Sequence, residues 1–415
     1  MGGNAAMKKL IIITSFLFSI TASAKTIHVG ANRNYKNIMA GIAAATSGDT
    51  VLVDAGLYRE QKITISKMIV LKGIDYPKLD GEKKFEIIAI KANGVIVEGF
   101  RMMHSGISNL EDISGIKVYD CNHVTIKNNI LEDTFFGIYI QNGVNCTIEN
   151  NQLTAQGGEE QQNANGIHCW KCDSMRIIGN KVSGHRDGIY FEFVKNSIIM
   201  RNTADKNIRY GLHFMFSNDD TYVGNIFRNN GSGVSVMFSK HIKMFNNFFE
   251  ENWGDAAHGI LLKEISDGYM SGNYFSKNTS AIFMEGASRV YMKHNTFENN
   301  GWALKIQASC MEVVLEENNF IGNTFDVGTN GSLVQNIFNH NYWDKYEGYD
   351  LNKDKIGDIP YRPVSMYSMI VEKYPPAMIL FRSFITALLD KTEKILPSNT
   401  PENLKDNAPL MKKAF

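Results

Sequence analysis

The chain has 415 residues, 44% of them hydrophobic, which is enough to build one elongated domain or two to three ordinary ones around a continuous core. Its 43 basic residues equal its 43 acidic residues in number. Because this balance gives no field of one sign that would gather a polyanion, we expect no nucleic-acid partner.

The N-terminus has the pattern of a signal peptide at residues 1–24. Lys8 and Lys9 precede an apolar run at residues 10–20, and Ala22-Ser23-Ala24 has the small side chains of a cleavage site. The run is too short to span a bilayer, which takes about 20 apolar residues. We therefore expect an exported protein whose mature chain begins at Lys25, with a buried N-terminal helix as the alternative.

Residues 36–46 predict a short amphipathic helix, which precedes the first strand at residues 48–53. In a stack of strands the edge of the first strand is open and has to be covered. We expect the helix to be this N-terminal cap.

A repeat of about 22 residues runs through the middle of the chain. Its first marker is a small residue followed by an aliphatic one, found at Gly115-Ile116, Gly137-Ile138, Gly166-Ile167, Gly188-Ile189, Gly211-Leu212, Gly233-Val234, Gly259-Ile260, Ala281-Ile282 and Ala303-Leu304. Its second marker is an asparagine in phase with the first, found at Asn129, Asn151, Asn180, Asn202, Asn225, Asn247, Asn273, Asn295 and Asn319. Two independent markers that share one period indicate a solenoid.

Each unit holds two or three short alternating strands separated by Gly, Asn and Asp, so it is too short for a β/α repeat with a full helix. It fits one coil of a parallel β-helix, in which strands of successive coils stack about 4.8 Å apart. We expect the recurring asparagine at a turn, where it tolerates left-handed geometry and bonds the amides above and below. The predicted fold class is all-β: a right-handed parallel β-helix at residues 25–345, with a cap helix before it and a helical extension after it.

Beyond the solenoid, residues 346–376 predict an acidic loop and connector, and residues 377–415 predict a C-terminal helix and tail. Two prolines end the strand pattern at residues 375–376, and residues 377–395 predict one amphipathic helix of up to about five turns. Arg382 interrupts the apolar stretch, so we expect no membrane span. The apolar face either covers the last coil or meets a partner.

Asp350, Asn352 and Asp354 have the spacing of oxygen ligands in a calcium loop. A strict loop of this kind has glycine at the sixth position, where this chain has Lys355. Bound calcium and a polar turn held by its own side chains are therefore alternatives.

The five cysteines are an odd number for an exported protein, and they do not indicate a full disulfide framework. If Cys169 and Cys172 share one extended strand, their Cα atoms lie about 10 Å apart, which is too far for a disulfide. A second Cys/His pair for tetrahedral zinc is lacking nearby. We predict core and turn residues, with a metal or redox role as the alternative. The five are Cys121, Cys146, Cys169, Cys172 and Cys310.

Several stretches resemble the signatures of one family. They are GHRDGIYFEF at 184–193, YGLHFMFS at 210–217, GVSVMFS at 233–239, NGWAL at 300–304, NTFDV at 323–327, and the run from NYW at 341–343 through GYD at 348–350 to GDIPYRP at 357–363. The tail from Leu396-Pro397 to residue 411 fits as well. Over roughly residues 25–411 the chain resembles the NosD accessory proteins, which help assemble the copper sites of periplasmic nitrous oxide reductase.

The resemblance implies a periplasmic, non-enzymatic subunit that is peripheral to the membrane through its partners. Those partners would be the permease and ATPase of an ABC transporter, a copper-chaperone lipoprotein and nitrous oxide reductase itself. Copper(I) would be a transient cargo.

Strand alternation places positions +2 and +4 after the repeated glycine on the outer face of one sheet. Position +2 then stacks His168, Tyr190, His213 and Ser235, and position +4 stacks Trp170, Glu192, Met215 and Met237. Neighbours in each row lie about 4.8 Å apart, so His213, Met215 and Met237 can converge on one Cu(I), which imidazole and thioether ligands suit. His168 and Glu192 are further candidates for the metal site.

Two alternatives to this copper site stay open. Met215 and Met237 could be ordinary apolar contacts under a loop or a partner. Other clusters could bind the metal, namely His104 with Met102 or His294 with Met292.

Fold analogy offers a rival function, because parallel β-helices often cleave or epimerise acidic polysaccharides as lyases, hydrolases or epimerases. A hydrolase needs two carboxylates roughly 5–10 Å apart. Asp187 and Glu192 are the candidates, with His185 and Arg186 beside them, but Asp187 is predicted in the turn before the strand, and the next coil has Arg209 and Tyr210 in place of a second acid. We therefore expect no enzyme, and an inert adhesin or structural solenoid is the third alternative.

Overall fold

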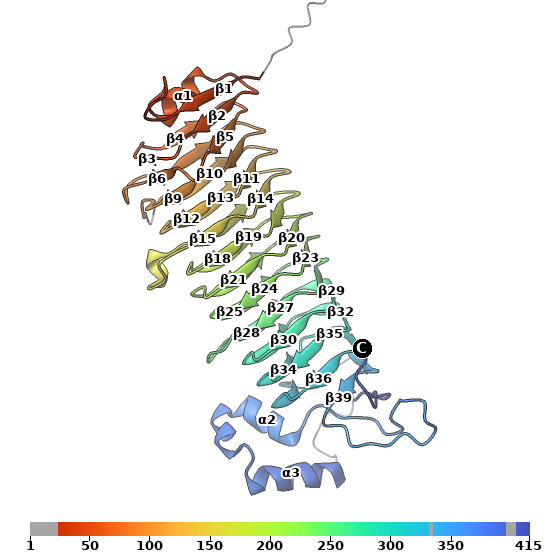
Figure 1. Cartoon of the computed structure of the whole chain (residues 1–415). Coiled ribbons are helices and arrows are strands. Elements are labelled where there is room, and N and C mark those ends of the chain that lie inside the picture. The colour runs from red at the N-terminus through yellow and green to blue at the C-terminus, as the bar shows by residue number, and fades with distance from the viewer. Residues whose placement is uncertain (1–23, 109, 332–334, 396–403) are drawn as a thin grey trace, which may run out of the picture.

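The computed structural model describes residues 24–108, 110–331, 335–395 and 404–415. The predicted signal peptide, apart from Ala24, lies outside the described residues. The chain forms a long rod, with α1 (Ile38–Ala44) at one end and α2 (Met366–Lys373) and α3 (Phe384–Ile395) at the other (Figure 1). The predicted right-handed parallel β-helix is confirmed: in the described residues, successive coils add strands to three parallel sheets of 14, 12 and 13 strands.

The three sheets are named S1, S2 and S3. S1 contains β1 (Thr26–Val29), β2 (Thr50–Val53), β5 (Val70–Gly73), β8 (Ile96–Glu98), β11 (Thr125–Lys127), β14 (Thr147–Glu149), β17 (Arg176–Ile178), β20 (Ile198–Met200), β23 (Thr221–Val223), β26 (Lys243–Phe245), β29 (Ser266–Ser271), β32 (Ser288–Lys293), β35 (Met311–Glu316) and β38 (Ile337–Asn339). S2 contains β4 (Ile63–Ile65), β7 (Ile88–Ile90), β10 (Ser114–Tyr119), β13 (Phe136–Gln141), β16 (Ile167–Trp170), β19 (Asp187–Glu192), β22 (Tyr210–Met215), β25 (Ser232–Met237), β28 (His258–Lys263), β31 (Ser280–Glu285), β34 (Trp302–Ile306) and β37 (Phe325–Gly328). S3 contains β3 (Leu57–Tyr58), β6 (Lys78–Asp80), β9 (Arg101–Met103), β12 (Ile130–Glu132), β15 (Gln152–Thr154), β18 (Lys181–Ser183), β21 (Thr203–Asp205), β24 (Ile226–Arg228), β27 (Phe248–Glu250), β30 (Tyr274–Ser276), β33 (Thr296–Glu298), β36 (Asn319–Ile321) and β39 (Tyr342–Trp343).

The glycine-aliphatic marker sets the register of S2. The aliphatic residue of each marker pairs with that of the next coil, from Ile116 through Ile189 to Leu304, and these side chains are fully buried. The preceding glycine allows a close approach of neighbouring backbones: a Cβ at Gly137 would lie 2.4 Å from the carbonyl oxygen of Gly166. The predicted stacking of this marker is therefore confirmed.

The interior is filled by side chains that repeat from coil to coil. On S3, aromatic rings stack along the axis with centroids 4.0–5.6 Å apart. They belong to Phe227, Phe249, Phe275, Phe297, Phe320 and Trp343. Such parallel offset stacks add to the burial energy of the rings.

The asparagine marker forms a buried ladder along the rod. At a typical rung, the Nδ2 of Asn225 donates to Oδ1 of Asn247 (2.9 Å) and to the carbonyl of Ile199 (2.9 Å), and its backbone N–H donates to the same Oδ1 (3.0 Å). The predicted bonding between stacked amides is confirmed, and it satisfies polar groups that burial would otherwise leave without partners. The rungs are Asn129, Asn151, Asn180, Asn202, Asn225, Asn247, Asn273, Asn295, Asn318 and Asn341.

Two details of the predicted ladder are wrong. The ninth rung is Asn318 and not Asn319, because the chain advances by 23 residues there and Asn319 is the first residue of β36. The left-handed backbone belongs to the residue before each rung, such as Arg201 (φ 56°) or Asn246 (φ 54°). The rung itself continues in extended geometry, so its amide points into the core.

The N-terminal cap lies where it was predicted. Asn37 caps α1 by accepting the backbone N–H of Ala40 (2.8 Å), and Ile38 and Ile42 are buried against the first coil. Gly41 permits this contact, because a Cβ there would lie 2.4 Å from a methyl group of Val29.

The C-terminal end differs from the prediction in two ways. The connector contains a helix, α2, which begins with a capping box at Ser365. The single helix predicted at residues 377–395 is a 3-10 turn, η2 (Pro375–Leu380), followed by a separate helix that begins at Phe384. Arg382, which interrupts the apolar run, lies in the bend between them with a left-handed backbone (φ 60°).

The last coil is closed by the tail and by α2. Asp406 terminates the asparagine ladder: its Oδ2 accepts the backbone N–H of Asn341 (2.9 Å), the Nδ2 of Asn341 (3.0 Å) and the indole N–H of Trp343 (3.1 Å). Tyr367 of α2 packs in one cluster with Trp302 and Phe325 of S2. The apolar face predicted to cover the last coil is thus supplied by α2, and the outer face of α3 stays uncovered in this chain.

All five cysteines are buried and unpaired, as predicted for core and turn residues. Cys169 lies in β16 and Cys172 lies in the turn after it, so the assumption that the two share one strand is wrong. The Cys172 thiol donates to the carbonyls of Trp170 (3.3 Å) and Ile140 (3.4 Å), which accounts for its place in the turn.

Asp220 is a buried acid with half of its carboxylate unpaired. Oδ1 accepts the backbone N–H of Ser197 (2.8 Å), whereas Oδ2 has no hydrogen-bond partner among the residues that the structure describes. Burial raises the pKa of Asp220 to about 8. The pKa of an aspartate in an unfolded chain is about 4. Between pH 4 and pH 8 the folded protein therefore keeps a proton on Asp220 that the unfolded chain releases. The free energy of unfolding falls as the pH rises through this window.

We expect Asp220→Asn to stabilise the protein at pH 7 by at least about 1 kcal/mol, because asparagine keeps the Oδ1 acceptor and cannot ionise. At pH 4 the gain should vanish. Denaturant unfolding of both proteins at the two pH values measures this. A variant that is less stable than the parent at pH 7 would contradict the assignment.

Candidate metal site

The predicted site lies on the outer face of S2, on strands β16, β19, β22 and β25. The register places His168 beside Tyr190, Tyr190 beside His213, and His213 beside Ser235. The parallel row places Glu192 beside Met215 and Met215 beside Met237. The two predicted rows therefore exist, with His213 and Met215 on one coil and Met237 on the next.

The two rows differ in exposure. His168 and His213 are only 9% and 6% exposed, whereas Met215, Met237 and Glu192 are half-buried. The inner row is covered because the insertion at residues 156–165 folds over the sheet: its backbone bonds to the coils on both sides, and Glu160 reaches Arg209 (3.7 Å). The site is therefore a partly covered sheet surface and not an open ladder.

The His213 ring lies beside the ion pair of Asp187 and Arg209. Its Nδ1 lies 3.6 Å from Oδ2 of Asp187, and the Asp187 carboxylate accepts two bonds from Arg209 (2.9 and 2.6 Å). The rings of Tyr190 and Tyr210 pack on it with centroids 5.0 and 4.9 Å away. Neither ring nitrogen of His213 has a hydrogen-bond partner in the described part of the chain. With Nδ1 turned toward a carboxylate, Nε2 keeps its lone pair for a metal ion, the usual arrangement of metal-binding histidines.

The Asp187 carboxylate stays charged although it is fully buried. Burial by itself raises its pKa, but His213 and Arg209 together lower it below the ordinary value. A negative charge therefore faces His213 at neutral pH.

His168 is oriented differently from His213. Its Nδ1 lies 3.0 Å from the amide nitrogen of Asn165, and the oxygen of that amide accepts from Arg186 (3.3 Å). The Asn165 N–H therefore occupies the lone pair on Nδ1, which leaves the proton on Nε2. Burial, reinforced by the charge of Arg186, lowers the pKa of His168 to about 3, so the ring is neutral. His168 can bind a metal only after it changes tautomer or breaks the bond to Asn165.

The methionines lie at the ends of β22 and β25. The Tyr190 hydroxyl points toward the sulfur of Met215 (3.9 Å), and burial together with Glu192 raises the pKa of that hydroxyl to about 12. Thioether sulfur and neutral imidazole are ligands that suit Cu(I). The carboxylate of Glu192 is a harder ligand and fits Cu(I) less well.

The two alternative clusters, His104 with Met102 and His294 with Met292, do not bring their side chains together. Met102 and Met292 are fully buried in the core, while His104 and His294 lie outside and bind Asp80 (3.0 Å) and Glu317 (2.7 Å). In each cluster the sulfur and the imidazole therefore lie on opposite sides of the strand.

The acidic loop is held by its own side chains. Asp350 accepts the backbone N–H groups of Asp354 (3.2 Å) and Lys355 (2.8 Å), and Asp354 accepts that of Ile356 (2.8 Å). These are the bonds of a polar turn. Calcium at Asp350, Asn352 and Asp354 stays a prediction, for which calorimetric titration with Ca²⁺ is the test.

The carboxylates considered for sugar chemistry do not form an open pair. Asp187 is the first residue of β19 and not part of the preceding turn, and it is engaged by Arg209 of the next coil. His185 is fully buried, and burial lowers its pKa to about 4.

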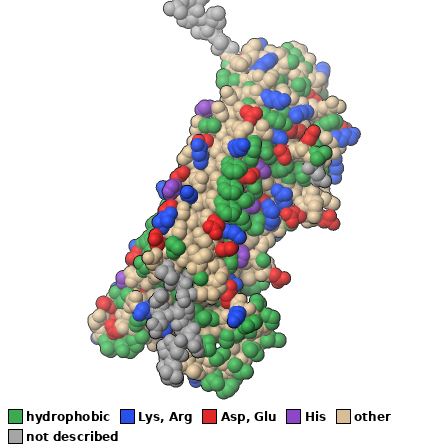
Figure 2. Space-filling model, turned by 180° about the vertical axis from the view of Figure 1, so that it is seen from behind, with side chains coloured by type: hydrophobic (Ala, Val, Ile, Leu, Met, Phe, Trp, Pro, Cys, Tyr) green, Lys and Arg blue, Asp and Glu red, His purple; other side chains and the backbone are tan. Residues whose placement is uncertain are grey.

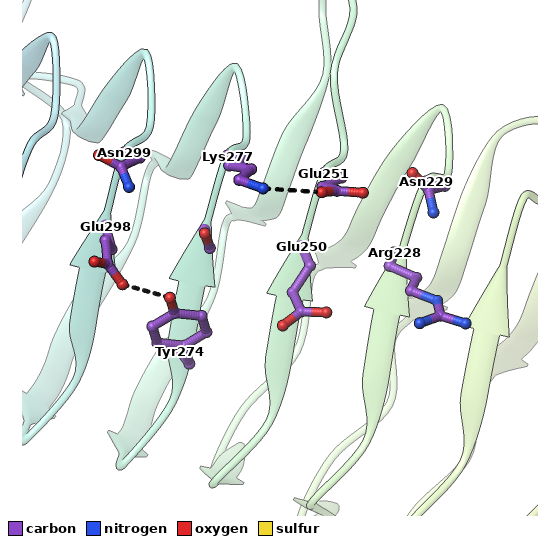
Figure 3. A pocket seen from close by; sticks show the side chains of 9 residues that line it. Arg228, Asn229, Glu250, Glu251, Tyr274, Lys277, Glu298 and Asn299 are labelled. Atoms are coloured by element: carbon purple, nitrogen blue, oxygen red, sulfur yellow. Dashed lines mark hydrogen bonds and ion pairs between the residues drawn. The ribbon is translucent and has the colours of Figure 1, made fainter.

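A well-formed hollow lies elsewhere, on the outer face of S3, with a volume of about 440 Å³ (Figure 3). Its charged side chains are largely paired with one another or with neighbours: Lys277 binds Glu251 (3.3 Å), Glu298 accepts the hydroxyl of Tyr274, and Arg228 binds Asp205 (3.5 Å). The hollow is therefore lined by a solvent-exposed network of ion pairs.

Sequence reasoning missed the ion pair beside His213. Asp187 and Arg209 are 22 residues apart, one coil, and that period is the signal that could have indicated their contact. Sequence reasoning also missed that the insertion at residues 156–165 covers the row of His168 and His213. The repeat pattern carries no information on the path of an insertion.

Within the described ranges no three or more His, Cys, Asp and Glu side chains are grouped so that they could hold a metal ion. The predicted ligand set is of another kind, since two of its three donors are sulfur atoms of methionine. Among the described residues, no helix combines the length and apolarity needed to cross a membrane. Together, the fold and this surface define a parallel β-helix protein with imidazole and thioether side chains on one outer face.

The comparisons with known proteins agree with that class. Residues 154–348 match the family described as periplasmic copper-binding protein (NosD), and residues 54–164 match the right handed beta helix region. The probable ABC transporter binding protein NosD of Stutzerimonas stutzeri is 25% identical over 378 residues, covering 86% of each chain. Its namesake from Pseudomonas aeruginosa is 26% identical over 354 residues, covering 81% of this chain and 82% of the relative. Over most of its length the chain is therefore similar to proteins of the NosD family.

A solved structure shares the fold alone. The catalytic domain of a GH87 α-1,3-glucanase superposes with a TM-score of 0.61 at 11% identity, covering 77% of this chain and 69% of that one. At this identity the likeness shows a common architecture, and function has to be argued from the site.

Proposed function

We propose that this chain is an exported periplasmic accessory protein that binds Cu(I) transiently while the copper sites of nitrous oxide reductase are assembled. It works with the permease and ATPase of an ABC transporter and with a copper-chaperone lipoprotein. A signal peptide at residues 1–24 directs its export, and the chain stays peripheral to the membrane through its partners.

The observation that carries the copper role is the arrangement of His213, Met215 and Met237. Nε2 of His213 has no hydrogen-bond partner among the described residues, and the thioether sulfurs of Met215 and Met237 belong to the same strand and to the next coil. Half-buried methionines on a sheet surface gain little from packing there, but their sulfur suits Cu(I).

The assembly role is tested by the copper content of the reductase. Nitrous oxide reductase purified from a strain without this gene is expected to lack copper, and the wild-type gene should restore it. A gene encoding Met215→Leu and Met237→Leu should restore little. Full copper loading in the deletion strain would contradict the proposed function.

The C-terminal helices are the proposed docking site for the transporter. Ile379, Phe384 and Leu388 are 89%, 82% and 54% exposed, and hydrophobic side chains gather at this end of the rod (Figure 2). The tail and α2 already close the last coil, so in the described part of the chain the outer face of η2 and α3 covers no coil. An exposed apolar face of this kind is typical of a protein contact.

We expect the triple variant Ile379→Gln, Phe384→Gln and Leu388→Gln to lose at least about 90% of its co-purification with the permease and ATPase, because an apolar interface cannot bury amide groups without cost. The test is affinity purification of the complex from membranes. This variant is preferable to truncation after Pro363, which would also remove Asp406. Leu57→Gln, at a 51% exposed leucine of the opposite end, is the control. Full recovery of the complex with the triple variant would show that these helices are only a cap.

A further inference from the structure

Three phenylalanines project from the rod beside the candidate metal site. Phe193, Phe216 and Phe238 are 45%, 40% and 42% exposed and stack on successive coils, with centroids 5.2 Å apart and planes within 13° of parallel. We call these three residues the phenylalanine stripe. A column of hydrophobic side chains is visible along this face of the rod (Figure 2).

The backbone at the stripe does not favour phenylalanine. All three residues have a left-handed conformation, with φ of 55°, 50° and 52°. Equivalent turns on neighbouring coils have Asn142 and Glu264, and asparagine is the residue that tolerates this geometry best after glycine. A bulky ring here is both strained and exposed, so the stacking energy of the rings is offset by a backbone cost that asparagine would not carry.

The ring stacking restricts what the stripe can bind. Because the rings are nearly parallel and cover one another's faces, their edges form the outer surface. A sugar or a cation is recognised by the face of an aromatic ring, and here stacking covers every ring face except the outer faces of Phe193 and Phe238. A row of apolar edges instead suits the apolar surface of another protein, where aromatic residues are the usual anchors.

The stripe is continuous with the metal site. Phe216 and Phe238 directly follow Met215 and Met237 at the ends of β22 and β25. Its two ends carry opposite exposed charges, which are Lys171 one coil before Phe193 and Glu264 one coil after Phe238. These charges lie roughly 19 Å apart at about 4.8 Å per coil. Because the two ends differ in charge, a partner with complementary charges would bind in one orientation.

We infer that the phenylalanine stripe is the docking surface for a Cu(I)-carrying protein, whose metal-bearing edge then lies against Met215 and Met237. The inference rests on the proposed function. Cu(I) does not persist as a free ion in oxygenated water, so it passes by ligand exchange between proteins in contact. An apolar anchor beside the two sulfur ligands, with one basic and one acidic end, supplies that contact and fixes its orientation.

The test uses the mature protein with Phe193→Asn, Phe216→Asn and Phe238→Asn together. Asparagine is chosen because Asn142 occupies the same turn, so the fold is kept. Cu(I) is offered in two forms: as a small chelate complex, and bound to the purified soluble domain of the copper-chaperone lipoprotein. Affinity from the chelate should change by less than about twofold, while the rate of transfer from the protein carrier should fall at least about tenfold.

Phe248→Thr, at a 40% exposed phenylalanine on S3, is the matched control and should transfer at the parental rate. If the triple variant accepts Cu(I) from the carrier as fast as the parent, the docking inference is wrong and the copper role is untouched. If the parent takes no Cu(I) from the chelate, the docking inference and the proposed function both fail.

Discussion

Replacing Met215 and Met237 together with leucine is expected to weaken Cu(I) binding at least about a hundredfold. Loss of a group that merely supports a ligand costs roughly 10- to 100-fold in metal affinity, and this change removes two ligands outright. Leucine keeps the volume and the apolar character, so stability should change by less than about 1.5 kcal/mol. Competition with a Cu(I)-specific chelator at fixed pH measures the affinity.

Met200→Leu is the matched control, because this methionine is also half-buried on a sheet surface but lies on S1. It should bind Cu(I) like the parent. An unchanged affinity in the double variant would mean that Met215 and Met237 are ordinary apolar contacts, the alternative that the sequence pattern leaves open.

The second large effect is expected at Asp406. Asp406→Ala should destabilise the C-terminal coils by about 3 kcal/mol or more, because two donors of Asn341 and the indole N–H of Trp343 lose their shared acceptor in a fully buried place. In a solenoid each coil contacts only its neighbours, so the loss should be local. Hydrogen exchange is expected to accelerate in the last coils and to stay slow near the N-terminus.

Asp406→Asn keeps one acceptor oxygen at the end of the ladder and should cost less. Asp344→Ala is a further control, since that exposed carboxylate accepts a backbone N–H from Gly322 (2.6 Å) outside the core. Uniformly faster exchange along the whole rod in Asp406→Ala would contradict a local cap.

The repeat makes the fold predictable from the sequence. Strand alternation gives the inward and outward faces, and a constant period turns a residue number into a position on the rod. For this reason the amino-acid sequence is sufficient to place His213 and Met215 in their two rows. The pattern is ambiguous where two asparagines are adjacent: Asn319 was predicted, and Asn318, 23 residues after Asn295, is the rung.

The sequence does not predict contacts made by segments outside the 22-residue repeat. The insertion at residues 156–165 covers His168, and the bond from Asn165 changes which nitrogen of that ring is free. The tail returns over many residues to place Asp406 at the end of the ladder. Helix α2 lies in a stretch predicted to be a connector, where a short helix is stabilised by tertiary packing on Trp302 and Phe325 more than by its own propensity.

Copper K-edge X-ray absorption of the Cu(I)-loaded protein tests the central claim most directly, because it reports the atoms bound to the metal. The expected first shell holds two sulfur scatterers and one imidazole, and Met215→Leu with Met237→Leu should remove both sulfurs. A shell of nitrogen and oxygen alone, or a sulfur shell that survives the double substitution, would place the copper elsewhere and contradict the site at His213, Met215 and Met237.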